Sequence, residues 1–310
     1  MKILIELPTW LGDSIMVSPA MENIVNSFDN VEITLIGSNA SVEALKNHPK
    51  VVASLVISKN YLSLYKYARL LGSFDTFFCF RGSIRSKIFK SLISSRSKFQ
   101  FNKKKYPNRH QVEKYCDFVN DSLRTNLPSG KLVVNLHKVE ETEEKLKPLV
   151  GINPGAVYGS SKRWLPEEYA KVAIKLASTY DILIFGSRSE VAIADEIEEL
   201  LQKNDITNYK NLAGKTSLME LTRLIKHLDF FITGDSGPMH LAAAFQIPTI
   251  SIFGPTKADE TSQWMNKKSI IVQTNLDCQP CMKRSCPLGH NNCMRLITAD
   301  QVLTAMKTIC

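Results

Sequence analysis

No stretch of this sequence is long and apolar enough for a membrane-spanning helix, since none approaches the roughly 18 apolar residues required. The first residues, MKILIEL, are apolar but reach Glu6 and Pro8 too early for a secretory signal. With 44% hydrophobic and 22% charged residues, the chain also lacks the composition of a disordered, collagen-like or disulfide-stabilised protein. These absences predict a globular protein of the cytoplasm, and its 310 residues are enough for two domains.

Two nucleotide-binding motifs are also missing. No G-x-G-x-x-G follows a strand-like segment, which argues against a dinucleotide dehydrogenase. The triplet Gly214-Lys215-Thr216 resembles the end of a P-loop, but Tyr209 stands where a P-loop requires its first glycine. We therefore expect a strand-to-helix turn at this triplet.

Positive charge is in excess and is unevenly distributed. The net charge is +9, with 22 Lys and Arg against 14 Asp and Glu in residues 1–150, and 17 against 16 in residues 151–310. Residues 81–114 hold 11 Lys and Arg and one acidic residue, Glu113. Such a segment suits an acidic substrate, an anionic membrane surface or a nucleic acid; a solvated basic face is the simpler interpretation.

Strand-like and helix-like segments alternate along the chain, which predicts βαβ units and parallel sheets. The alternation breaks at the polar stretch KVEETEEKLKP (138–148), the predicted linker, and then restarts. We therefore predict an α/β protein with two doubly wound, Rossmann-like domains, residues 1–147 and 148–310, and a ligand site in the cleft between them. Thr298 and Gln301 fit a capping box, which predicts a helix over the last residues.

The segment DFFITGDSGPMHLAAA (229–244) is the strongest indication of a site. An apolar strand ends in Gly-Asp, a tight turn follows, and the proline suits the first turn of a helix. Backbone N–H groups at such a helix start, together with the helix dipole, bind anions. The residues from Asp235 to His240 then lie where open α/β sheets bind ligands. Ordinary capping by Asp235 or Ser236, with His240 packed in the core, is the alternative.

A second polar loop lies in NPGAVYGSSKRW (153–164). Its residues 160–163 supply two hydroxyls and two cations, a set that suits a diphosphate. A solvent-exposed loop is the alternative.

A third loop, PTWLGDS (8–14), leads into a helix-like segment. Gly12 permits a close backbone approach, and Asp13 lies at the helix start. Asp13 is a candidate general base at the interdomain cleft, and a role as helix N-cap is the simpler alternative.

Four of the seven cysteines lie close together in the sequence: Cys278, Cys281, Cys286 and Cys293. A cytoplasmic chain of this size needs no disulfides. Four thiolates, with His290 nearby, suit a structural zinc ion, but the spacing is irregular and contains only one Cys-x2-Cys pair. Free or packed thiols are the favoured interpretation, with zinc and disulfide formation as alternatives.

At these three loops the chain resembles the ADP-heptose–lipopolysaccharide heptosyltransferases of glycosyltransferase family 9. The resemblance runs the whole length, and PGAVYGSSKRWLPEEYA and TGDSGPMHLAAA are its most specific segments; the run CQPCMKRSCPLGHNNCM occurs in many members. The Lys-Arg-Trp form of the second loop is similar to the type II members, which add the second heptose of the inner core. The resemblance implies the GT-B architecture, two facing Rossmann-like domains.

The resemblance also implies roles for individual residues. Asp13 corresponds to the catalytic aspartate, and Lys162 to the lysine that binds the leaving phosphate. Glu190 corresponds to a ribose-binding acid, and the adenine lies near Lys215 and Thr216. The implied donor-binding residues are Ser160, Ser161, Lys162, Arg163, Glu190, Lys215, Thr216, Asp235, Ser236, Gly237, Met239 and His240. The implied acceptor-binding residues are Gly12, Arg81, Arg85, Arg109 and His110. The segment YPNRHQ (106–111) contains a proline and no apolar period, so we expect a mobile loop that orders over the acceptor and protects residues 103–112 from hydrogen exchange.

These assignments imply an inverting glycosyltransferase that moves L-glycero-D-manno-heptose from ADP-heptose to heptose I of the lipopolysaccharide or lipooligosaccharide inner core. Heptosyltransferases I and III, which act on Kdo or another core sugar, are alternatives within the family. A non-catalytic nucleic-acid binder is the alternative from another class, because aromatic residues interleave with the basic segment. That alternative leaves the donor motifs unexplained, so no nucleic-acid partner is expected.

Two further expectations concern the need for a cofactor and the place in the cell. No Asp-x-Asp pair occurs in the sequence, so no metal cofactor is expected for the transfer. The acceptor is implied to be lipid A–core, which places the enzyme peripherally on the cytoplasmic face of the inner membrane.

Overall fold

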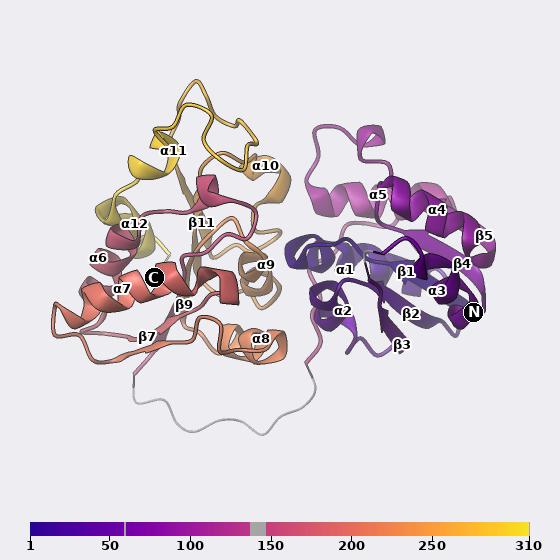
Figure 1. Ribbon diagram of the computed structural model, residues 1–310, viewed down its shortest axis with the longest axis horizontal. Helices are drawn as coiled ribbons and strands as arrows, with labels where there is room; N and C mark the ends of the chain where they lie inside the picture. The colour runs from indigo at the N-terminus through magenta and orange to yellow at the C-terminus, as the bar shows by residue number, and fades with distance from the viewer. Residues whose placement is uncertain (59, 137–146, 310) are drawn as a thin grey trace. The chain divides into compact units, whose positions relative to one another are not determined.

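The computed structural model describes residues 1–58, 60–136 and 147–309, and the chain divides between residues 137 and 138 into two compact units (Figure 1). The predicted boundary was 147/148; residues 138–146 of the predicted linker lie outside the described residues. Each unit is built on one parallel sheet. In the described parts of the chain, no helix is long and apolar enough to cross a membrane.

The N-terminal unit has a five-stranded sheet in the order β3-β2-β1-β4-β5. Its strands are β1 (Lys2–Glu6), β2 (Glu32–Gly37), β3 (Val51–Val56), β4 (Ser73–Cys79) and β5 (Ser94–Gln100). Its helices are α1 (Leu11–Asn26), α2 (Asn39–Leu45), α3 (Ser63–Leu71), α4 (Ile84–Leu92) and α5 (Gln111–Leu123), with a 3-10 turn η1 (Lys103–Lys105).

The central strand β1 is covered on both faces, which is why its sequence is almost continuously apolar. On one face, α3 and α4 pack Leu64 and Phe89 against Leu4 and Phe77 of the sheet. Helix α1 packs with α2 and α5 in a separate group. The strand order reverses between β1 and β4, which is where an open sheet of this kind leaves a crevice for a ligand.

The C-terminal unit has a six-stranded sheet in the order β11-β10-β9-β6-β7-β8. Its strands are β6 (Leu149–Asn153), β7 (Asp181–Ile184), β8 (Tyr209–Asn211), β9 (Phe230–Gly234), β10 (Thr249–Phe253) and β11 (Ser269–Gln273). Its helices are α6 (Pro166–Leu176), α7 (Val191–Gln202), α8 (Leu218–Lys226), α9 (Gly237–Ala244), α10 (Ala258–Thr261), α11 (Asn292–Arg295) and α12 (Ala299–Lys307), with 3-10 turns η2 (Ser160–Lys162) and η3 (Arg188–Glu190).

The core of this unit lies between the sheet and the group α6, α7 and α12, while α8 packs with α9 (Figure 1). Trp164 is fully buried there, stacks edge-on against Tyr169 at 4.6 Å, and donates its indole N–H to the Ile297 carbonyl at 2.9 Å. The capping box of Thr298 and Gln301 starts α12, as predicted. The strand order reverses between β6 and β9, so both sheets have the doubly wound order that the sequence predicts.

Most of the basic segment 81–114 forms regular secondary structure. It contains α4, β5, η1 and the start of α5. The mobility expected of residues 106–111 stays a prediction; Tyr106, the first of them, is buried, stacks on Phe101 and donates its hydroxyl hydrogen to Asp121 at 2.8 Å. His110 closes the segment as the buried N-cap of α5.

Candidate active site

In the C-terminal unit, an ion pair lies at the point where the strand order reverses. Lys162 follows β6, Asp235 follows β9, and the Lys162 Nζ lies 2.5 Å from the Asp235 Oδ2. The Thr256 hydroxyl, after β10, donates to the same oxygen at 2.7 Å. The two charged side chains are only 12% and 8% exposed. Two loops that were separate in the sequence analysis therefore meet in one largely buried polar site.

The loop that carries Lys162 is held from behind by the loop of the cysteine run. Ser161 donates its hydroxyl hydrogen to the Lys283 carbonyl at 2.6 Å, and its N–H donates to the Arg284 carbonyl at 3.2 Å. Gly159 allows this contact, because a Cβ there would lie 2.2 Å from the Arg284 oxygen. The expected donation from Ser161 to a ligand disagrees with this geometry: its buried hydroxyl fixes the loop. Ser160 is exposed.

Two cation–π contacts to one tyrosine ring also hold this loop. The Lys162 ammonium lies 4.6 Å from the ring centre of Tyr158, and the guanidinium of Arg284 lies 5.3 Å from it. Such cation–π contacts restrict where the lysine can point. Arg163 extends from the same turn, and its buried Nε has no hydrogen-bond partner among the described residues.

Helix α9 begins beside the ion pair. Its N-cap is Ser236, not Asp235, and the Ser236 side chain makes no capping hydrogen bond. That hydroxyl instead contacts the Thr233 hydroxyl at 3.0 Å and the Asn153 amide at 3.3 Å. No side-chain cap therefore occupies the first N–H groups of the helix, from Gly237 on, and they are suited to an anion.

Met239 and His240, on the first turns of α9, are buried at 0% and 3% exposure. The structure thus agrees with the alternative of a packed histidine, and neither side chain presents an exposed group.

Glu190 occupies the loop after β7. It is 5% exposed, and its Oε2 accepts a hydrogen bond from the Ser187 N–H at 2.7 Å in a capping box. Its carboxyl group also lies against Gly155, where an added Cβ would stand 2.1 Å from the Glu190 Cδ. Glu190 therefore lies at the same edge of the sheet as Lys162, held by backbone contacts; its role toward a ribose remains a prediction.

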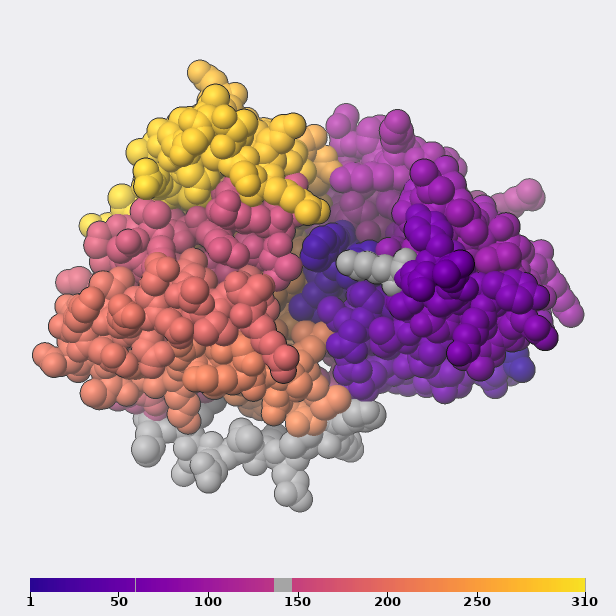
Figure 2. Space-filling model, viewed as in Figure 1, coloured from indigo at the N-terminus to yellow at the C-terminus, as the bar shows by residue number. Residues whose placement is uncertain are grey.

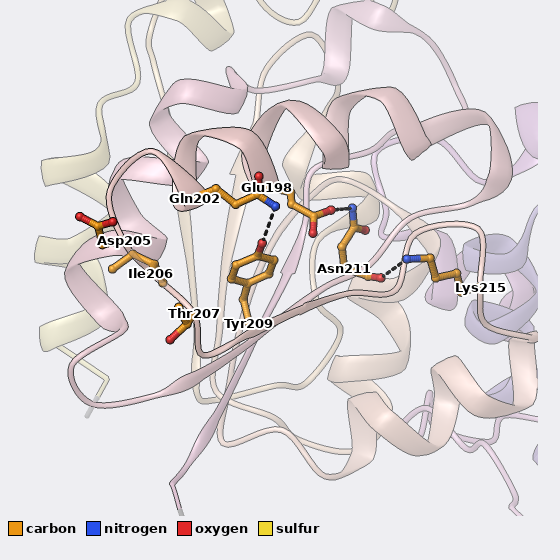
Figure 3. Close-up of a pocket in the computed structure, with 8 residues that line it drawn as sticks. All are labelled: Glu198, Gln202, Asp205, Ile206, Thr207, Tyr209, Asn211 and Lys215. Carbon is orange, nitrogen blue, oxygen red and sulfur yellow. Dashed lines mark hydrogen bonds between the residues drawn. The ribbon is translucent and has the colours of Figure 1, made fainter.

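Lys215 and Thr216 follow β8, at the edge of the sheet. Lys215 borders a pocket of about 440 Å³ between α7 and β8, and its Nζ donates to the Asn211 carbonyl at 3.0 Å (Figure 3). Strand β8 lies two positions from β6 in the sheet, or roughly 10 Å away. The expected turn is present at Gly214, whose φ is 70°.

In the N-terminal unit, Asp13 lies in the first turn of α1. The N-cap of that helix is Trp10, so the interpretation of Asp13 as a mere N-cap is wrong. The Tyr115 hydroxyl of α5 donates a hydrogen bond to the Asp13 carboxylate, and the Gln111 side chain contacts the same hydroxyl. Gly12, beside Asp13, is buried.

Tyr115 is well fixed for this contact. It is 3% exposed, and its ring packs against Phe101 at 4.9 Å and Phe80 at 5.5 Å. Burial, followed by the charge of Asp13, raises the pKa of Tyr115 well above its usual value. The hydroxyl therefore keeps its proton and acts as a donor toward Asp13.

A buried carboxylate, Glu6, ends β1 at the reversal point of this sheet. Arg81 lies 3.5 Å from it, and the Ser86 hydroxyl donates to it at 3.1 Å. Arg85, which directly precedes Ser86, is 8% exposed and donates a hydrogen bond to the Ser58 carbonyl at 2.5 Å. Burial lowers the pKa of Arg85. The structure thus brings Arg81 and Arg85 together at the carboxyl ends of β1 and β4.

Arg109 and His110 are placed differently, at the start of α5. Arg109 forms ion pairs with Glu113 at 2.9 Å and Asp117 at 3.0 Å, and the hydrogen bond that it donates to Glu113 raises its pKa. The His110 Nδ1 accepts the Val112 N–H at 3.2 Å. Lys114, from the same segment, is 2% exposed. The basic segment 81–114 is therefore not one open basic face.

The four clustered cysteines are free thiols in the structure, with Cys293 buried and the other three half-buried. Burial raises the pKa of Cys293 to about 11, while the N–H of Asn291 lowers the pKa of Cys286. Among the described residues, no group of three His, Cys, Asp or Glu side chains is arranged to hold a metal ion. Structural zinc stays an untested alternative to the free or packed thiols that the sequence favours.

The geometry defines a class of protein. Two doubly wound units in one chain, one with a lysine and a helix start suited to phosphates and the other with a firmly held carboxylate, are typical of a nucleotide-sugar glycosyltransferase.

Comparison with known proteins agrees with this class. Residues 85–291 match the family description glycosyltransferase family 9 (heptosyltransferase). Over its full length the chain is 39% identical to lipooligosaccharide heptosyltransferase 2 of Campylobacter jejuni, and covers 98% of that protein. The chain belongs to glycosyltransferase family 9, and it is a glycosyltransferase.

Solved structures confirm the fold class. The structure of ADP-heptose lps heptosyltransferase II from E. coli matches 100% of this chain and 98% of its own, with a TM-score of 0.82 at 22% identity. The E. coli heptosyltransferase WaaC with ADP matches all of both chains with a TM-score of 0.77 at 16% identity. The predicted GT-B class, two Rossmann-like domains in one chain, is confirmed.

Proposed function

We propose that this enzyme transfers L-glycero-D-manno-heptose from ADP-heptose to heptose I of the lipooligosaccharide or lipopolysaccharide inner core, with inversion at the anomeric carbon. The full-length similarity to a heptosyltransferase 2 supports the type II assignment over types I and III. The observation that carries the donor assignment is the meeting of Lys162, Asp235 and the start of α9 at one point of the sheet.

The donor diphosphate binds at this point. Lys162 supplies the positive charge, and the N–H groups at the start of α9, from Gly237 on, supply oriented donors. As the bond from heptose to phosphate breaks, negative charge grows on the leaving ADP, and these groups stabilise it. Asp235 then accepts hydrogen bonds from sugar hydroxyls. We propose that these protein groups serve in place of a divalent metal cofactor.

Asp13 acts as the general base. It removes the proton from the attacking hydroxyl of the acceptor, the new bond forms at the anomeric carbon, and ADP leaves with the electron pair of the old bond. Tyr115 positions the carboxylate and favours its charged form by hydrogen bonding. A single displacement of this kind inverts the anomeric configuration.

The acceptor is lipid A–core, and it contacts the N-terminal unit. Its carboxylates and phosphates suit Arg81 and Arg85, which stand at the reversal point of that sheet. The enzyme therefore acts as a peripheral protein at the cytoplasmic face of the inner membrane. No nucleic acid is part of the proposal.

A mass-spectrometric transfer assay tests the proposal. The purified protein is mixed with ADP-heptose and a set of truncated cores that end in Kdo, in heptose I or in heptose II. We expect a gain of one heptose only on the core that ends in heptose I. A gain on the Kdo core or on the heptose II core would reassign the enzyme to type I or type III, and no gain on any core would refute heptose transfer.

A further inference from the structure

The apolar side of helix α4 faces solvent. A helix at the surface of a protein ordinarily buries its apolar side. Ile84, Ile88 and Leu92 recur every four residues and form one stripe on the solvent side, with exposures of 73%, 42% and 39%. The buried side carries Arg85, Ser86 and Phe89. An apolar stripe on the outer face of a helix is not explained by the core of this unit.

Helix α3 packs against α4 and extends the same feature. Tyr61, Leu62, Tyr65 and Leu70, on α3 and just before it, are between 56% and 88% exposed. Exposed apolar residues elsewhere in the described chain are more scattered along the sequence. We name the seven residues on the two helices the α3–α4 surface: Tyr61, Leu62, Tyr65, Leu70, Ile84, Ile88 and Leu92. These helices belong to the N-terminal unit, drawn in indigo to purple in Figure 2. Exposed apolar residues gathered on two packed helices are typical of an interaction site.

The charged residues in the segments that carry this surface are all of one sign. Residues 60–72 and 81–100 contain no Asp or Glu. Lys66, Arg69 and Lys87 are exposed within it, and the Arg69 guanidinium lies 5.9 Å from the ring centre of Tyr65. Apolar side chains, tyrosines and cations on one amphipathic face are the combination that inserts into the headgroup region of an anionic bilayer.

We propose that the α3–α4 surface is the membrane-docking surface of the enzyme, and that its occupant is an anionic phospholipid bilayer. The apolar stripe of α4 enters the interface, the two tyrosines lie at headgroup level, and the lysines and arginines contact lipid phosphates. This inference deepens the membrane part of the proposed function and rests on it.

The placement of α4 connects docking with the acceptor. The helix begins directly after β4, and its inward side carries Arg85, beside Arg81 and Glu6. One helix therefore faces the bilayer with its outer side and the acceptor arginines with its inner side. A lipid-anchored acceptor that reaches this sheet edge remains close to its own membrane.

Vesicle co-sedimentation tests the proposal without any need for turnover. Vesicles of phosphatidylcholine alone are compared with vesicles that also contain phosphatidylglycerol. We expect the wild-type protein to bind the anionic vesicles and to release as salt rises. The variant Ile84→Ser/Ile88→Ser/Leu92→Ser should bind about tenfold or more weakly, because apolar area no longer enters the interface. Its heptose transfer to a deacylated, water-soluble core should equal that of the wild type.

A matched control is Met265→Ser/Leu296→Ser, two exposed apolar residues of the C-terminal unit, which should bind vesicles as the wild type does. Wild-type binding to anionic vesicles by the triple variant would overturn the proposal, and so would absence of binding by the wild-type protein. A wild-type dimer that becomes monomeric in the triple variant would assign the surface to a second copy of the chain. Because vesicle binding is read without substrate, failure of heptose transfer would refute the proposed function and leave this result interpretable.

Discussion

At the scale of single residues, the proposed chemistry depends on two side chains in different units, and each can be removed alone. Asp13→Asn removes the proposed base but keeps nearly the same shape. We expect turnover to fall about 100- to 10,000-fold, the usual cost of losing a general base. ADP affinity, measured by calorimetry, should stay near that of the wild type, because Lys162 and α9 belong to the other unit. Asp29→Asn, an exposed change in the same unit, is the control. Turnover within threefold of wild type in Asp13→Asn would reduce Asp13 to a structural residue.

Tyr115→Phe separates positioning from catalysis. The hydroxyl stabilises the charged form of Asp13, so its loss makes Asp13 take up a proton at a higher pH. Since the base must be ionised to act, the acidic limb of the kcat/KM profile should move to higher pH by about one unit. Tyr106→Phe removes a buried hydroxyl bound to a different carboxylate, Asp121, and should leave the limb in place. Equal profiles for both variants and the wild type would contradict the positioning role.

Lys162→Ala tests the diphosphate contact. Loss of a charged hydrogen bond costs about 1.5–3 kcal/mol, so ADP affinity should fall about ten- to 150-fold while adenosine binding is unchanged. The transfer rate should fall as well, since the contact strengthens as ADP leaves. Lys257→Ala, an exposed lysine of the same unit that pairs with Glu260, is the control. Equal ADP affinity in Lys162→Ala and wild type would place the diphosphate elsewhere.

The residue types of the site could be predicted from the sequence, but their partners could not. Asp13, Lys162 and Asp235 stand beside Gly and Pro residues in recognisable loops. Tyr115 and Thr256 carry no such local signal, because they reach the site only through the folding of distant segments. Ser161 shows the opposite case: a hydroxyl in the right loop that the fold turns inward onto the Lys283 carbonyl.

At the scale of elements, the turn η2 depends on a backbone contact that tolerates no side chain. In Gly159→Ala the new Cβ would meet the Arg284 carbonyl, so the turn must move away from the loop behind it. We expect weaker ADP binding with little change in the melting temperature of the N-terminal unit. Gly130→Ala is the control, because a Cβ there has no neighbour within 4 Å. Wild-type ADP affinity in Gly159→Ala would show that the turn is not braced in this way.

Buried elements could be predicted from the sequence better than edge elements. The strand at residues 230–234 is buried throughout, and the sequence predicts it correctly. Strand β5, with the sequence SSRSKFQ, lies at the edge of its sheet and has no apolar period to indicate it. Helix α4 was also not predicted. Its buried side carries Arg85 and Ser86 and its apolar side faces solvent, so it lacks the pattern of a helix that packs on a core.

At the scale of the whole molecule, the two units carry separate cores, and each should respond to its own ligand. We expect ADP to slow amide hydrogen exchange in residues 154–165 and 235–240, where the donor is proposed to bind. Exchange in α1 and α5 should change little until acceptor is added. Protection by ADP confined to the N-terminal unit would reverse the assignment of the two substrates.

We also expect the ion pair of Lys162 and Asp235 to make the site selective among anions. An isolated lysine at a helix start would collect inorganic phosphate from its surroundings. Here a tethered carboxylate already occupies that place at a high effective concentration, of the order of millimolar or above. A small free anion gains too little to displace it, whereas a nucleotide-sugar adds ribose and base contacts to its phosphates. We therefore expect the Asp235 carboxylate to compete with small anions for Lys162, so that only a ligand with several contacts displaces it.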